Sequence, residues 1–113
     1  FKEILDKGAL DIIQPDVLVA GGISTCRKIF ALAEAFNVQV ATHSFFYGPA
    51  MAATVQLGIS SVNSEWIEVN AVPLEEYFID PPVRPREGFI KAPDKIGLGF
   101  AVDENVINRR LKK

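Results

Sequence analysis

Residues 9–22 read ALDIIQPDVLVAGG, an apolar run that ends at Gly21 and Gly22. A run of this kind is typical of a strand that is buried on both faces and then enters a loop. In the following segment, residues 25–36, apolar side chains recur at helical spacing with charged residues on the opposite side. The sequence therefore predicts a strand followed by a helix, with Ser24 as the N-cap of the helix.

The same order of strand and helix recurs further along the chain. Residues 38–44 read VQVATHS, a β-favouring run with a polar end. Pro49 then begins a segment of small and apolar residues that predicts a second helix, and residues 65–70, EWIEVN, predict a third strand. The three strands are predicted to begin at Asp11, Val38 and Glu65. Both intervals are 27 residues, close to the roughly 30 residues of a strand–helix–strand unit, so we predict an α/β fold with a parallel sheet.

The C-terminal part of the chain has a different composition. Five prolines fall within 21 residues and bracket a predicted edge strand, GFIKA, at residues 88–92. Asp103 is predicted to cap a short helix that runs towards Lys113. The sequence thus divides into an α/β part, residues 1–72, and a tail, residues 73–113.

The N-terminal segment predicts that the chain continues a longer protein. Residues 1–8, FKEILDKG, are typical of the last turn of a helix that closes at Gly8, and no initiator methionine precedes them. We therefore expect the rest of the same polypeptide to be the main structural partner of this chain.

Composition and charge argue against several classes of protein. Twelve basic and fourteen acidic residues give a net charge of −2, and no basic stripe predicts a nucleic-acid partner. No apolar run approaches the roughly 18 residues of a membrane span. The single cysteine, Cys26, excludes an internal disulfide and a thiolate metal cluster, and its place on the apolar side of a helix predicts a core residue. We expect a cytoplasmic protein with a small-molecule partner.

One ionisable residue stands at the end of each predicted strand: Asp16, His43 and Glu68. In parallel α/β folds these ends converge on the ligand-binding edge of the sheet. A neutral imidazole accepts a proton near pH 7, and an aspartate on the neighbouring strand can fix its tautomer and stabilise the imidazolium. We therefore predict that His43 and Asp16 form a catalytic pair. A protonated Glu68 in the same cavity would donate a hydrogen bond to a developing enolate oxygen.

Each of these residues also has a structural interpretation. His43 can be a hydrogen-bonded structural residue, Asp16 a turn residue after a proline, and Glu68 a solvent-facing strand residue. Phe45 and Tyr47 follow His43 and are candidates for the wall of a substrate pocket, although packing under a loop is the alternative.

The chain resembles the C-terminal part of enolase-superfamily enzymes of the mandelate racemase subgroup, the mandelate racemase/muconate lactonizing enzyme family. The resemblance spans residues 9–107 in the strings QPDVLVAGG, AEAFNVQVATHS, YGPAMAATVQL, EWIEVN and EGFIKAPDKIGLGF. It implies that the chain supplies the sixth to eighth strands of a modified (β/α)7β TIM-like barrel. It further implies that the tail returns to pack against the barrel and an N-terminal capping domain.

The resemblance also implies roles for the three residues at the strand ends. His43 matches the family's general base at the end of the seventh strand, and Asp16 matches its partner at the end of the sixth. Glu68 matches the acid on the eighth strand that hydrogen-bonds the substrate carboxylate. An aspartate where other branches of the superfamily have a lysine is typical of the mandelate racemase subgroup.

The implied enzyme is magnesium-dependent and abstracts the α-proton of a carboxylate substrate to form an enolate. Its Mg²⁺ ligands lie on earlier strands, so we assign no metal ligand in this chain and expect the chain alone to be inactive. We favour an acid-sugar dehydratase that forms homo-oligomers, with a racemase or epimerase of an α-hydroxy acid as the alternative. A rival interpretation is a non-catalytic α/β binding or assembly domain.

Overall fold

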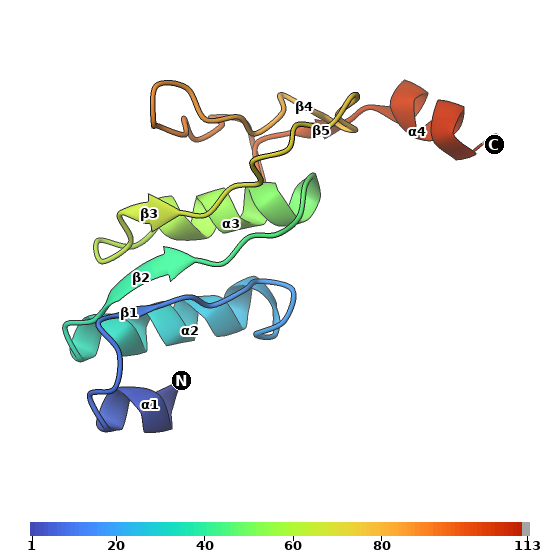
Figure 1. Cartoon of the computed structure of the whole chain (residues 1–113). Helices are drawn as coiled ribbons and strands as arrows, with labels where there is room; N and C mark the ends of the chain where they lie inside the picture. Colours follow the sequence, from blue (N-terminus) through green and yellow to red (C-terminus); the bar gives the residue numbers. More distant parts are fainter. Residues whose placement is uncertain (112–113) are drawn as a thin grey trace.

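The computed structural model describes residues 1–111, and its elements form an α/β layer followed by an extended tail (Figure 1). In chain order the elements are α1 (Lys2–Asp6), β1 (Ile12–Ile13), α2 (Gly22–Ala35), β2 (Gln39–Thr42), α3 (Pro49–Ile59), β3 (Trp66–Ile67), β4 (Ile79–Asp80), β5 (Ala101–Val102) and α4 (Glu104–Leu111).

The strands β1, β2 and β3 form one parallel sheet in that order. Ile12 is in register with Gln39, and Ala41 is in register with Trp66. The helices α2 and α3 follow β1 and β2 and lie on the same side of the sheet (Figure 1). The predicted α/β fold with a parallel sheet is therefore confirmed.

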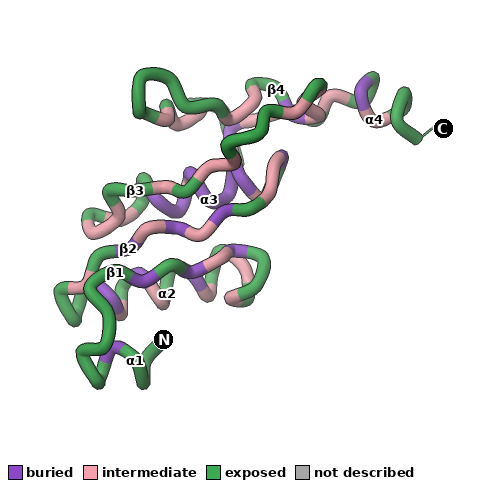
Figure 2. Tube along the Cα trace, viewed as in Figure 1, coloured by how far each residue is buried: buried purple, intermediate pink, exposed green. Residues whose placement is uncertain are grey.

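A hydrophobic core cluster lies between this sheet and its two helices. On α2 the buried side chains of Cys26, Phe30 and Ala33 follow the spacing of one helical face, and they pack against Ile13 and Val40 of the sheet. Figure 2 shows the buried segments concentrated on α3 and on the facing strands. The prediction that Cys26 is a core residue is confirmed, because its exposed fraction is 1%.

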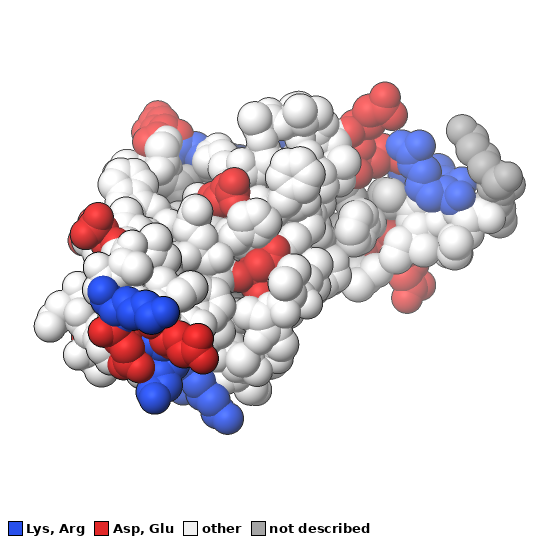
Figure 3. All heavy atoms as spheres, turned by 60° about the horizontal axis from the view of Figure 1, so that its bottom comes forward, with Lys and Arg blue, Asp and Glu red and all other residues white. Residues whose placement is uncertain are grey.

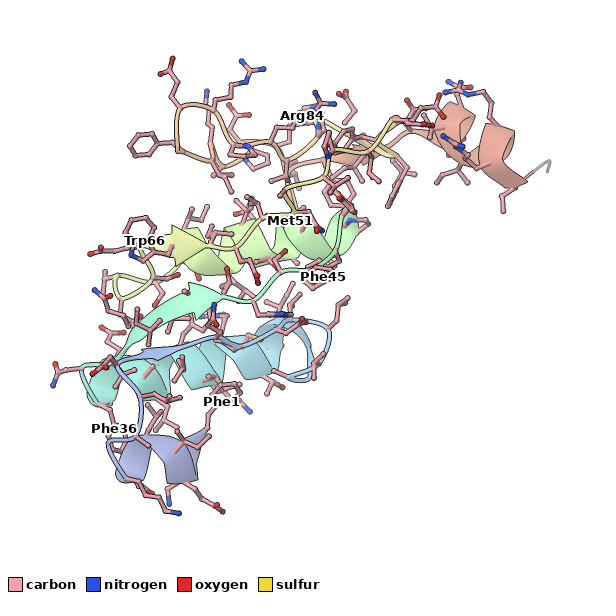
Figure 4. All side chains as sticks on the ribbon, in the orientation of Figure 1. Phe1, Phe36, Phe45, Met51, Trp66 and Arg84 are labelled. Carbon is pink, nitrogen blue, oxygen red and sulfur yellow. The ribbon has the colours of Figure 1, made fainter. Side chains whose placement is uncertain are left out.

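The opposite face of the sheet is open. Successive strand residues point to opposite faces, so Ile13 is buried under the helices whereas its neighbour Ile12 is 43% exposed. The register places Trp66 on the same open face as Ile12, and Trp66 is 64% exposed (Figure 4). Within residues 1–111 the first strand is therefore buried on one face only, because both helices cover the same side, and its burial on both faces stays a prediction for the complete protein.

Two other local predictions are wrong. Ser24 is not the N-cap of α2, because the helix already begins at Gly22 and its N-cap is Gly21 in a left-handed conformation. Residues 88–92 do not form a strand. Glu87 and Gly88 have positive φ angles, and the backbone turns tightly so that Arg86 and Phe89 hydrogen-bond each other.

The strand pairing in the tail is instead between β4 and β5, which run antiparallel. After β5, Asp103 caps α4 as predicted, since its Oδ1 accepts hydrogen bonds from the amides of Asn105 at 3.0 Å and Val106 at 3.2 Å. The predicted end of this helix at Lys113 lies outside the described residues.

The tail extends away from the α/β layer (Figure 1). The molecule measures 51 × 29 × 27 Å, and its radius of gyration is 15.4 Å, compared with about 13 Å for a compact domain of this length. Figure 3 shows side chains of both charges gathered at its two ends, where α1 and α4 lie, and separate acidic side chains scattered between them. None of the helices within residues 1–111 is long and apolar enough to cross a membrane.

Candidate active site

The parallel register continues beyond the ends of the strands and brings the three candidate residues to one edge. The amide of His43 donates a hydrogen bond to the carbonyl oxygen of Pro15 at 3.2 Å, and Asp16 pairs with His43 as a parallel bridge. The amide of Glu68 donates to the carbonyl oxygen of Thr42 at 3.2 Å. Side-chain alternation then places all three candidates on the open face of the sheet, away from α2 and α3.

His43 and Asp16 are directly hydrogen-bonded. The distance from His43 Nδ1 to Asp16 Oδ2 is 2.7 Å. Because a carboxylate only accepts hydrogen bonds, Nδ1 carries a proton, and in the neutral imidazole the lone pair is then on Nε2. The Asp16 side chain is only 13% exposed, whereas the His43 side chain is 43% exposed. The carboxylate is therefore largely enclosed, and the imidazole remains accessible. The predicted contact between the two side chains is present.

Asp16 also has the structural role that the sequence suggested as an alternative. Its second oxygen, Oδ1, accepts hydrogen bonds from the amides of Leu18 at 2.7 Å and Val19 at 3.2 Å, which fixes the turn after β1. One carboxylate therefore closes the turn with one oxygen and orients His43 with the other.

These contacts lower the pKa of Asp16 below its ordinary value of 3.8. Burial acts in the opposite direction and raises the pKa of this carboxyl. The hydrogen bond from His43, the hydrogen bonds from the amides of Leu18 and Val19, and the attraction of His43 outweigh burial. Asp16 is therefore ionised at neutral pH, as a partner for an imidazolium must be.

Glu68 faces the same space as His43. Its Oε2 lies 3.8 Å from His43 Nε2 and accepts a hydrogen bond from the amide of Ser44 at 2.9 Å. The interpretation of Glu68 as a residue that only faces solvent does not hold, although its side chain is partly exposed. In this contact the carboxyl group is an acceptor, and the protonated form that donates to an enolate stays a prediction.

Ser44 was not among the candidates from the sequence, yet it contacts a residue of the site and a residue of α3. Its amide orients Glu68, and its buried hydroxyl lies 2.8 Å from Met51 Sδ on α3. A backbone amide has no sequence signature, so only the structure identifies this contribution.

The two aromatic candidates differ in their surroundings. Phe45, two residues after His43 in the loop that follows β2, is 77% exposed, and its role as a pocket wall stays a prediction (Figure 4). The hydroxyl of Tyr47 instead donates a hydrogen bond to the carbonyl oxygen of Val72, and its ring packs edge-on against Tyr77. The structure therefore joins Tyr47 to the segment after β3.

A Mg²⁺ ion would need ligands from residues other than those that the structure describes. Within residues 1–111 no group of three or more His, Cys, Asp or Glu side chains is arranged to hold a metal ion. The described residues therefore do not fit a Mg²⁺ site by themselves.

The lowered pKa of Asp16 predicts how stability depends on pH. Its contribution should be fully present above the pKa of the unfolded chain, near 3.8, and should be lost as pH falls through the lower folded-state value. We expect the difference in free energy of unfolding between the unsubstituted protein and Asp16→Asn to shrink over this interval, as measured by denaturant titration of the complete protein. Asp11→Asn serves as the control, and a difference that grows on acidification would contradict the prediction.

Comparison with known proteins gives a consistent result. The family described as Enolase C-terminal domain-like matches residues 1–106. The chain is 41% identical over 115 residues to the D-galactonate dehydratase of Variovorax paradoxus (strain S110), and the match covers 95% of this chain and 30% of that protein. It is 34% identical over 121 residues to the D-galactonate dehydratase of Ralstonia pickettii (strain 12J), covering 100% of this chain and 32% of that protein.

The fold is also similar to that of solved structures. A mandelate racemase/muconate lactonizing enzyme-like protein from Roseovarius sp. TM1035 matches with a TM-score of 0.85 and 33% identity, over 96% of this chain and 27% of that one. The chain thus spans about a third of the length of the curated relatives it matches.

Proposed function

Because the chain belongs to the Enolase C-terminal domain-like family, we propose that it carries the proton-transfer pair of an acid-sugar dehydratase. The observation that carries this proposal is the 2.7 Å hydrogen bond between His43 Nδ1 and Asp16 Oδ2 at the ends of adjacent parallel strands. The similarity to two D-galactonate dehydratases supports D-galactonate as the first substrate to test.

The pair is suited to removing a proton from carbon. In the neutral imidazole, Nε2 of His43 has a free lone pair and an accessible position, so it can take the proton on the carbon next to the substrate carboxylate. The ionised Asp16 then stabilises the imidazolium through the Nδ1 hydrogen bond. The electrons of the broken C–H bond form an enolate.

Dehydration follows from the same imidazolium. His43 returns the proton to the β-hydroxyl of the substrate as the C–O bond breaks, and water leaves. The product is an enol that converts to a 2-keto-3-deoxy acid. Glu68, held by the amide of Ser44 beside Nε2, is placed to hydrogen-bond the substrate when its carboxyl group is protonated.

The rest of the polypeptide completes the site in this proposal. The sheet has Ile12 and Trp66 exposed on its open face, and the other strands of a TIM-like barrel would cover them. The Mg²⁺ ligands of the enzyme would lie in that part too, and so would the capping domain against which the tail, residues 73–113, packs. The isolated chain is accordingly proposed to be inactive.

Incubation of the complete protein with D-galactonate and Mg²⁺ in D₂O tests the function. The proposal expects loss of the α-hydrogen and accumulation of the 2-keto-3-deoxy acid, both followed by NMR. Exchange of the α-hydrogen in a substrate that keeps its β-hydroxyl group would support the racemase or epimerase alternative instead. Absence of both reactions across a panel of acid sugars would contradict the proposed function and favour a binding domain.

A further inference from the structure

The loop between β2 and α3, residues 43–48, begins with His43 and has no regular secondary structure after that residue. Three successive residues of the loop contact the segment that follows β3. The side-chain amide of Asn70 donates a hydrogen bond to the carbonyl oxygen of Phe46 at 3.4 Å, and the hydroxyl of Tyr47 donates to the carbonyl oxygen of Val72. The loop is thus held by a segment more than twenty residues further along the chain.

The third contact involves Gly48 and Phe78. Gly48 has a φ angle of 69°, and a Cβ atom there would overlap the ring of Phe78. Only glycine combines this backbone conformation with so close an approach of an aromatic ring. The end of the loop and the beginning of α3 are therefore fitted against the tail.

The Tyr47 ring is itself held in place. It meets the ring of Tyr77 edge-on at a centroid distance of 6.5 Å and an angle of 78°. The guanidinium of Arg84 lies over the Tyr77 ring, 4.3 Å from its centroid. Such edge-to-face and cation–π contacts favour one ring orientation. The contacts among Tyr47, Tyr77 and Arg84 therefore fix the direction of the Tyr47 hydroxyl.

We infer that Tyr47 is a positioning residue, which holds the loop of His43 against the segment that follows β3 and thereby fixes the imidazole for proton transfer. This inference rests on the proposed function. Its physical basis is that a loop without its own backbone ladder samples several conformations unless outside contacts select one. A displacement of about 1 Å at a reacting group can lower a rate about 10²-fold.

A positioning role and a substrate-binding role have different kinetic consequences. Removing a contact made equally in the ground state and the transition state raises KM, whereas disturbing the alignment of the base lowers kcat. For Tyr47→Phe in the complete protein we expect kcat for D-galactonate to fall about 10-fold with KM changed less than about two-fold. Hydrogen exchange of the amides in residues 44–48 should become faster.

Tyr77→Phe is the matched control, because it removes the other tyrosine hydroxyl of the chain and keeps the ring that packs against Tyr47. Asn70→Leu is an independent variant that breaks the neighbouring attachment to Phe46, and it should give a smaller loss of kcat with KM retained. It also tests the inference if Tyr47→Phe does not fold.

The outcomes separate this inference from the proposed function. A higher KM at unchanged kcat in Tyr47→Phe would make Tyr47 a substrate contact and overturn the inference, as would unchanged kinetics and unchanged hydrogen exchange. Either result leaves the dehydratase proposal intact as long as the unsubstituted protein dehydrates D-galactonate and His43→Asn does not. If the unsubstituted protein produces no keto acid, the proposed function itself fails.

Discussion

Replacing His43 with asparagine is expected to lower kcat of the complete protein for D-galactonate about 10⁴-fold or more. Asparagine retains a hydrogen-bonding group near the position of Nδ1, so the contact with Asp16 has a substitute. It has no basic nitrogen at the position of Nε2, so the group proposed to accept the α-proton is lost. Steady-state formation of the 2-keto-3-deoxy acid, together with solvent deuterium incorporation at the α-carbon, measures the loss.

The double variant His43→Asn/Asp16→Asn is the appropriate control for this result. If the two residues act as one unit, the second substitution should add little to the loss caused by the first. Thermal unfolding of each variant establishes that the protein remains folded. Retention of α-hydrogen exchange in folded His43→Asn would show that another group is the base.

Asp16→Asn is expected to lower kcat between about 10²- and 10⁴-fold while KM changes little. The side-chain oxygen of asparagine can still accept the hydrogen bonds from Leu18 and Val19, so the turn after β1 is retained. The negative charge that stabilises the imidazolium is lost, and the amide no longer enforces a proton on Nδ1. The pH dependence of kcat and kcat/KM, measured beside activity, reports the change at the imidazole.

Asp11→Asn makes the same chemical change at an exposed aspartate just before β1 and should leave the kinetics unaffected. If both substitutions had equal and small effects on kcat, Asp16 would be a turn residue only. The hydrogen bond to His43 would then be structural.

The order of elements was predictable because periodicity is a local property of the sequence. The spacing of the strand starts at Asp11, Val38 and Glu65 reflects the length of one strand–helix unit, and the structure has a parallel sheet in that order. The contact between Asp16 and His43 was predictable for a related reason, since residues one repeat apart lie at equivalent heights on adjacent parallel strands.

Features that depend on distant segments were not predictable in this way. Residues 88–92 have the composition of a strand, but positive φ angles at Glu87 and Gly88 turn the chain, and the strand pairing occurs at β4 and β5 instead. The amide of Ser44 that orients Glu68 has no sequence signal. Tyr47 lies close to His43 in the sequence, which favours a place in the wall of a substrate pocket. In the structure its hydroxyl donates a hydrogen bond to the carbonyl oxygen of Val72, 25 residues away.

A crystal structure of the complete protein with bound D-galactonate would test the central claim most directly. The account predicts that His43 Nδ1 remains hydrogen-bonded to Asp16 Oδ2 and that Nε2 lies about 3–3.5 Å from the substrate α-carbon. A substrate bound with its α-carbon out of reach of Nε2, or an imidazole turned away from Asp16, would contradict it.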